Sequence, residues 1–207
     1  MRIPARVLTL IAMVGIVVYV VVDIVLQLLP PHYSVIADAE SNLGVGPFGW
    51  VMSLNFLGRA VTSIALGGAL LLSIRHSIRR NLGLTLFVTA GSCSAVLAFF
   101  PTDIAPTGAT RVAPTTVQGA VHLVAASTGF VLALVGCWLL TLELREAPVG
   151  TASLRPTALF LGIASVGLLF LAVTIVALPA ILGLAERICL VGILGWAFAT
   201  ARQLRSR

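Results

Sequence analysis

Six polar side chains lie inside long apolar stretches of this 207-residue sequence, and their types could support ligand binding, proton transfer or ion pairing. They are Asp23, Asn55, Arg59, His122, Glu186 and Arg187. A charged side chain in a lipid-facing helix is costly, so such residues usually face the interior of a helix bundle or a water-filled cavity. We therefore treat them as candidates for a functional site.

The four charges in this set almost cancel, because Asp23 and Glu186 oppose Arg59 and Arg187. Three interpretations of these charges remain open, one of which is that Arg187 reaches partly toward the outer headgroups. They could form ion pairs that fix the register of the helices, since pairing offsets part of the desolvation cost. They could instead line a polar site that water reaches from one side of the membrane. Asn55 precedes Arg59 by four residues, which places both on one face of a helix.

His122 is the only histidine inside an apolar stretch. Asp103, Glu186 and His32 could complete a metal site with it, but the sequence has neither an HExxH nor an HxxxH pattern. The cysteines lie inside apolar stretches without metal-ligand spacing, and we expect buried apolar side chains at Cys93, Cys137 and Cys189. We predict a hydrogen-bonded histidine, with no metal and no cofactor.

The elements that must position these residues are six apolar stretches. A bilayer core of about 30 Å requires roughly 20 helical residues. The stretches that meet this length are roughly 7–29, 48–72, 82–100, 117–142, 158–178 and 181–201. Only 10% of the residues are charged and 59% are hydrophobic, which excludes an ordinary soluble domain. We predict an all-α bundle of six transmembrane helices in a single domain, residues 1–207.

The arginines predict the orientation of this bundle in the membrane. All basic residues are arginine, and they lie in short clusters between apolar stretches, which is typical of topology signals and not of a nucleic-acid surface. With the N-terminus inside, ten arginines fall in cytoplasmic segments and only Arg111 lies in an outer loop. The ten are Arg2, Arg6, Arg75, Arg79, Arg80, Arg145, Arg155, Arg202, Arg205 and Arg207. Both termini are therefore predicted to be cytoplasmic. The absence of lysine suggests a GC-rich bacterial genome and the bacterial cytoplasmic (inner) membrane.

In this orientation the polar residues share one depth, in the outer half of the bilayer. His122 falls in the second turn of the fourth helix and the Glu186-Arg187 pair in the second turn of the sixth. Asp103 and Glu40 lie in outer loops on the same side. The sequence therefore predicts an outer pocket in which Asp103, His122, Glu186 and Arg187 converge. The candidate ligand-binding residues of this pocket are Asp103, His122, Glu186, Arg187, Arg59, Asn55, Asp23 and Glu40.

Several short motifs occur together in a characteristic order. They are Ser-Asn-Leu-Gly at 41–44 with Trp50, Asn-Phe-Leu-Gly at 55–58, Phe-Pro-Thr-Asp at 100–103, Gly-Ala-Val-His at 119–122 and Gly-Leu-Ala-Glu-Arg-Ile at 183–188 with Trp196. This order resembles the family of prokaryotic six-helix membrane proteins catalogued as domain of unknown function number 998. The resemblance runs from about Val7 to Ala199. It implies six helices and singles out Asp103, His122, Glu186 and Arg187, but it implies no activity.

Three functions are compatible with this pattern. The first is a protein that binds or transports a small polar solute or lipid headgroup in the outer pocket. The second is an intramembrane lipid-modifying enzyme with Asp103 and His122 as acid–base groups, although no GxSxG motif or metal signature supports one. The third is an accessory subunit of a membrane complex. The expected partners are membrane lipids and no nucleic acid, and glycines in the spans would allow a homodimer or a larger membrane complex.

Overall fold

The computed structural model describes residues 4–106, 110–146 and 154–206. Within these ranges the chain forms six long helices, two short 3-10 turns and no strand, which confirms the all-α prediction. The long helices are α1 (Ala5–Leu28), α2 (Gly49–Ser73), α3 (Ile78–Leu97), α4 (Val117–Glu146), α5 (Arg155–Ala177) and α6 (Leu182–Arg205). The 3-10 turns are η1 (Glu40–Gly44), between α1 and α2, and η2 (Pro179–Ile181), which leads into α6.

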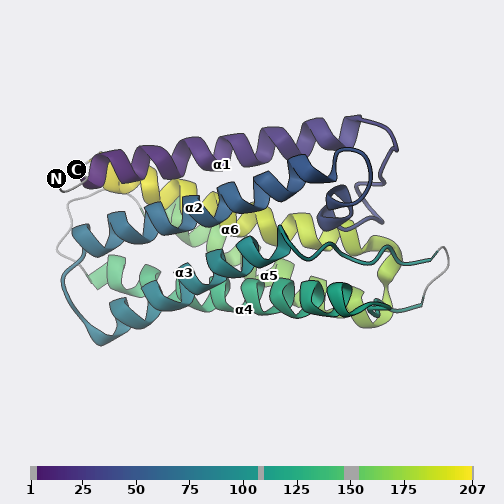
Figure 1. Ribbon diagram of the computed structural model, residues 1–207. Coiled ribbons are helices and arrows are strands. Elements are labelled where there is room, and N and C mark those ends of the chain that lie inside the picture. The colour runs from purple at the N-terminus through teal and green to yellow at the C-terminus, as the bar shows by residue number, and fades with distance from the viewer. Residues whose placement is uncertain (1–3, 107–109, 147–153, 207) are drawn as a thin grey trace.

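Five of the six helices are long and apolar enough to cross a membrane, so the chain has the character of a multi-pass membrane protein. The exception is α3, which begins with Ile78-Arg79-Arg80-Asn81 and carries several serines and threonines farther along. In Figure 1, α3 nevertheless runs lengthwise with the other helices, and it packs between α2 and α4. Six crossings therefore remain a prediction, whereas the six-helix arrangement is observed.

The helices form a closed ring in which each helix packs against its neighbours in the sequence and α1 packs against α6 (Figure 1). Helix α6 also contacts α2 and α4, which makes it the central element. Both chain termini lie at one end of the bundle, which we call the proximal end. The connections between α1 and α2, α3 and α4, and α5 and α6 all lie at the opposite, distal end.

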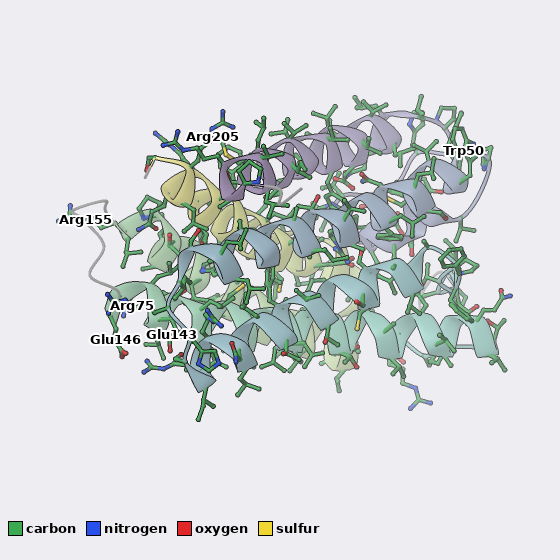
Figure 2. All side chains as sticks on the ribbon, turned by 60° about the vertical axis from the view of Figure 1, so that its left-hand side comes forward. Trp50, Arg75, Glu143, Glu146, Arg155 and Arg205 are labelled. Atoms are coloured by element: carbon green, nitrogen blue, oxygen red, sulfur yellow. The ribbon has the colours of Figure 1, made fainter. Side chains whose placement is uncertain are left out.

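Charged side chains gather at the proximal end. Figure 2 shows Arg75, Arg155 and Arg205 there, together with two glutamates of α4, whereas Trp50 lies at the distal end. Arg79 forms ion pairs with both glutamates, at 3.2 Å from Glu143 and 2.8 Å from Glu146. These groups would meet water and lipid headgroups at one face of a membrane.

The apolar core has a proximal and a distal part. The proximal part surrounds the fully buried Trp196 of α6, whose indole packs on Phe87 and donates to the Thr141 hydroxyl at 2.8 Å. The distal part centres on Tyr19, Met52 and Phe56. The candidate polar residues lie around this distal part.

Candidate functional site

The Phe-Pro-Thr-Asp and Gly-Ala-Val-His motifs interlock at the distal end of α3 and α4. Helix α3 has ended before Pro101, so the carbonyl of Phe100 is free, and it accepts a hydrogen bond from Nδ1 of His122 at 2.6 Å. The Asp103 carboxylate lies directly against Gly119, where a Cβ atom would collide with it. The two motifs thus join the loop after α3 to the first turns of α4.

Asp103 serves as a cap for α4. Its Oδ2 accepts from the backbone N–H groups of Thr115 and Thr116 at 2.6 and 2.8 Å, and its Oδ1 accepts from the Thr116 hydroxyl at 2.8 Å. These three donors lower the pKa of Asp103 to about 2. A carboxylate held in this way stays ionised and is a poor proton donor, so the geometry does not favour the acid–base role considered for Asp103.

The loop after α1 docks onto the first turns of α6. The backbone N–H of Glu40 donates to Oε2 of Glu186 at 2.7 Å, and the N–H of Leu184 donates to the carbonyl of Ile36 at 3.0 Å. Arg187 donates from Nη1 to the carbonyl of Asp38 at 2.8 Å. The Glu186-Arg187 pair therefore fixes the first distal loop, with Glu186 turned toward α4 and α5 and Arg187 toward α1.

A cavity of about 280 Å³ lies between α4, α5, α6 and this loop, and we call it the distal cavity. His122, Glu186 and Asp103 line it together with Asn42, and the remaining walls are mostly apolar. The lining includes Leu123, Phe130 and Val131 of α4 and Leu168, Leu171, Ala172 and Ile175 of α5. Polar groups thus lie at the distal end of a largely apolar space.

The distal cavity opens toward the surroundings between α4 and α5. These two helices pack less closely than any other pair of neighbours in the ring. They are joined at mid-height by a hydrogen bond from Trp138 to Ser165, at 3.2 Å. Val131 and Ala172 both line the cavity and are both exposed. In a membrane, this opening would face lipid.

The hydrogen bond of His122 fixes what its other ring nitrogen can do. A carbonyl only accepts, so Nδ1 must carry the proton that it donates to Phe100. In the neutral ring Nε2 is then an acceptor. His122 is 3% exposed, and Nε2 has no hydrogen-bond partner among the described residues. A buried acceptor without a partner is unfavourable, which marks this atom as a contact for a ligand or water.

A second polar cluster lies between α1, α2 and η1. Glu40 is 4% exposed, and its Oε2 accepts from the hydroxyl of Tyr19 at 3.0 Å. Arg59 donates to the same hydroxyl at 3.3 Å, and Asn55 donates to the Tyr19 carbonyl at 3.1 Å. Burial and the nearby carboxylates of Asp23 and Glu186 raise the pKa of Glu40 to about 8. Glu40 is therefore mostly protonated at neutral pH.

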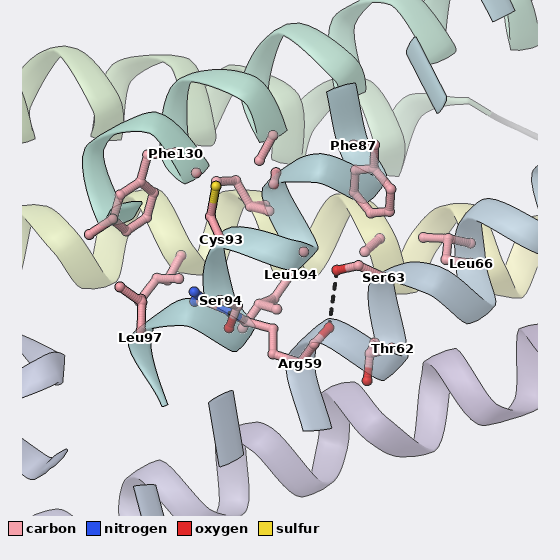
Figure 3. A pocket seen from close by; sticks show the side chains of 18 of the residues that line it. Arg59, Thr62, Ser63, Leu66, Phe87, Cys93, Ser94, Leu97, Phe130 and Leu194 are labelled. Atoms are coloured by element: carbon pink, nitrogen blue, oxygen red, sulfur yellow. Dashed lines mark hydrogen bonds between the residues drawn. The ribbon is translucent and has the colours of Figure 1, made fainter. Parts of the chain in front are cut away.

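Arg59 also borders a smaller cavity of about 60 Å³ at the centre of the bundle (Figure 3). Its Nε donates to the Ser94 hydroxyl at 2.8 Å, and Ser94 in turn donates to the carbonyl of Phe56 at 2.9 Å. The rest of the lining is mostly apolar. Ala126 and Phe130 line both this central cavity and the distal cavity, so they form the wall between them.

A comparison with known protein families covers most of the chain, including these motifs. The model described as "Protein of unknown function (DUF998)" matches residues 13–203. The chain belongs to this family. The expected resemblance is thereby confirmed, and the match spans every candidate residue of the distal end. No curated protein and no solved structure matches the chain.

The residues predicted for the outer pocket lie in three different places in the structure. Asp103, His122 and Glu186 line the distal cavity, as the common depth suggested, but Arg187 does not. Arg187 lines a groove between α1 and α6, together with two other candidates, Asp23 and Glu40. Arg59 borders the central cavity. Asn55 donates a hydrogen bond to the backbone carbonyl of Tyr19.

The ion-pair interpretation of the interior charges is wrong for the described residues. No carboxylate of the described residues lies within 4.0 Å of the Arg59 or Arg187 guanidinium, whereas Arg79 forms ion pairs at the proximal end. Arg59 instead uses hydroxyl groups, and Arg187 uses backbone carbonyls. Neutral acceptors hold each guanidinium without neutralising its charge.

Sequence reasoning missed three polar residues of the distal end. Tyr19 and Ser94 are the partners of Arg59, and Asn42 lines the distal cavity. Tyr19 precedes Asp23 by four residues, so the helical spacing placed it on the same face of α1. Asn42 belongs to the Ser-Asn-Leu-Gly motif that carried the family resemblance, which was a usable signal.

Proposed function

We propose that this membrane protein binds an amphiphile in the distal cavity. The observation that carries the proposal is the buried, unpartnered Nε2 of His122 beside a cavity that is otherwise mostly apolar and opens between α4 and α5. A ligand from the bilayer could enter sideways through this opening. Its polar head would meet His122 and Glu186, and its apolar part would lie along α5.

The chemistry of the lining favours a particular kind of head. Nε2 of His122 and the carboxylate of Glu186 both accept hydrogen bonds, so the head must supply O–H or N–H donors. A volume of about 280 Å³ is near the lower limit of common ligand pockets, so it suits one chain with a compact head. A purely polar solute fits less well, because Leu168, Leu171 and Ile175 would remain in contact with it.

The proposal includes a topology in the bacterial cytoplasmic membrane with six crossings and both termini inside. Its support is that Arg75, Arg155 and Arg205 lie at the proximal end beside the termini (Figure 2), as the positive-inside rule requires of a cytoplasmic face. Arg2 and Arg207 lie outside the described residues. The distal cavity would then open in the outer half of the bilayer.

Cysteine labelling in intact cells tests this topology. In a variant without native cysteines, we expect Thr110→Cys at the distal end to react with a membrane-impermeant maleimide, and Ser206→Cys at the proximal end to react only after permeabilisation. Both positions are exposed, so access is comparable. The reverse pattern of labelling would show that the distal cavity opens toward the cytoplasm.

Filling the cavity mouth tests the proposed binding. We expect Ala172→Trp to lower the affinity for a monoacylglycerol, which has two hydroxyl donors and one chain, at least about tenfold, or about 1.4 kcal/mol. Native mass spectrometry of the delipidated protein measures this affinity. Ala172 is exposed at the mouth of the cavity, so the larger side chain does not have to displace the core.

Val173→Trp is the matched control, since Val173 is the next residue of α5, is exposed and does not line the cavity. It should bind the monoacylglycerol as the wild type does. If both tryptophan variants bind as the wild type does, the distal cavity is not the binding site. An accessory-subunit role would then be the better account of the fold.

A further inference from the structure

A second candidate site lies in the groove between α1 and α6, which has a volume of about 440 Å³. Val20 and Ile24 line it from α1, and Val191 and Leu194 line it from α6. Polar side chains line it only near its distal part. The groove and the distal cavity have no lining residue in common, because Glu186 and Arg187 face different sides of α6.

Arg187 brings unused hydrogen-bond donors to this groove. Its Nη1 donates to the carbonyls of Asp38, Val35 and Gly183, at 2.8, 3.1 and 3.1 Å. Its Nε and Nη2 are buried, yet they have no partner among the described residues. These two N–H groups lie on one edge of the guanidinium, the arrangement that holds two oxygens of a phosphate.

Asp23 brings a carboxylate to the same groove. Gln27 donates to its Oδ2 at 2.5 Å, whereas its buried Oδ1 has no donor other than the neighbouring carboxyl group of Glu40 among the described residues. No ion pair joins Asp23 to Arg187 within the described residues, although both line the groove. Leaving charged groups buried and unpaired is costly, so the groove is complementary to a ligand that carries both signs of charge.

The polar and apolar parts of the groove follow each other as the headgroup and acyl chain of a membrane lipid do. Asp23 lies five residues before Leu28, where α1 ends, and Arg187 lies five residues after Leu182, where α6 begins. At 1.5 Å per residue both are about 7–8 Å inside the distal ends of their helices. The apolar part of the groove runs from this level toward the middle of the bundle, as an acyl chain runs below its headgroup.

We propose that this groove binds a phospholipid with an ethanolamine headgroup. The phosphate accepts from Nε and Nη2 of Arg187, the ammonium donates to Oδ1 of Asp23, and one acyl chain lies between α1 and α6. A choline headgroup has no N–H donor for Asp23. A glycerol headgroup offers neutral hydroxyl donors but no positive charge to the Asp23 carboxylate. The site is independent of the proposed function, because its polar contacts do not include His122.

Lipid binding to the delipidated protein tests the headgroup. In native mass spectrometry with synthetic lipids of identical chains, we expect phosphatidylethanolamine to bind about tenfold more tightly than phosphatidylcholine or phosphatidylglycerol. Asp23→Asn keeps an oxygen for Gln27 but removes the charge, so this preference should disappear. Equal binding of the three lipids to the wild type would overturn the proposal.

A matched pair of variants tests the groove itself. Val20 lines the groove, so Val20→Trp should weaken phosphatidylethanolamine binding at least about tenfold. Val21 is its exposed neighbour outside the groove, so Val21→Trp should bind as the wild type does. Melting temperatures of both variants establish that each is folded. Equal losses in the two variants would refute the location.

Two further measurements separate the alternatives. Soluble glycerophosphoethanolamine should not compete at concentrations at which the lipid binds, and competition there would show a solute site instead of a lipid site. Ala172→Trp should leave phosphatidylethanolamine binding unchanged, because Ala172 lines only the distal cavity. Weaker phosphatidylethanolamine binding in that variant would contradict a separate groove site. If only monoacylglycerol binding is weakened, the variant has affected the distal cavity and the groove site is supported as separate.

Discussion

Replacing Gly192 with valine is expected to destabilise the bundle more than any other single change considered for this protein. Gly192 of α6 lies against the backbone of Ala164 in α5, and a Cβ atom there would overlap with the backbone nitrogen and Cα of Ala164. Backbone atoms in a helix cannot move aside as a flexible side chain can. Forcing the two helices apart should cost about 3 kcal/mol, or a fall in melting temperature of roughly 6–12 °C.

Gly162 offers a matched control for this prediction. It lies in α5, the other helix of this pair, where it is exposed, and a Cβ atom there would have no neighbour within 4 Å. Gly162→Val should therefore melt close to the wild type. Thermal unfolding in one detergent measures both variants. Similar melting temperatures for the two would show that α5 and α6 do not approach each other this closely.

The second large effect expected is a loss of stability as the pH rises from 6 to 9, caused by Glu40. Glu40 lies in η1, outside the membrane-spanning helices, and faces charged and titratable groups from three helices. These are Tyr19 and Asp23 of α1, Arg59 of α2, and Glu186 and Arg187 of α6. Burial among the carboxylates favours the protonated form.

The sign of this effect follows from the two pKa values of Glu40. Its pKa is about 8 in the folded protein and 4.5 in the unfolded chain, so the folded state binds the proton more tightly. The stabilisation is fully present below about pH 4.5 and is lost as the pH rises through about 8. Between pH 6 and 9 we expect a loss of about 3 kcal/mol in the free energy of unfolding.

The variant Glu40→Gln isolates this contribution. Glutamine imitates the protonated carboxyl and can still accept from Tyr19, so its stability should stay constant between pH 6 and 9. Glu146→Gln, at the proximal end, should keep the slope of the wild type. Chemical unfolding at several pH values gives these slopes. A wild type whose stability rises over this range would show that Glu40 is ionised in the folded protein.

Hydropathy predicted the existence and order of the helices, but not their polar ends. The predicted third span began at residue 82, whereas α3 begins at Ile78, because the Ser77 hydroxyl accepts from the N–H of Arg80 and starts the helix earlier. Helix α4 continues beyond residue 142 to Glu146, where the glutamates pair with Arg79. Such ends depend on hydrogen bonds between segments, which an apolar window does not record.

The depth of the polar residues was predictable from the sequence, but their partners were not. Depth follows from position along a helix, and Asp103 and His122, for which it predicted a similar depth, line the same cavity. Partners depend on how each helix is rotated about its axis. Adjacent residues on α6 therefore separated, with Glu186 in the distal cavity and Arg187 in the groove beside α1. Counting charges suggested ion pairs, whereas the hydrogen bonds that the two arginines make go to neutral groups.

An experimental structure of the protein in lipid bilayers with added monoacylglycerol tests the central claim most directly. We expect density for an elongated ligand in the distal cavity, with its head oxygen about 3 Å from Nε2 of His122 and its chain beside Leu168 and Ile175. The density should be absent in Ala172→Trp and present in Val173→Trp. A distal cavity that holds only water in the wild type, or a ligand bound with its head away from His122, would contradict the proposed function.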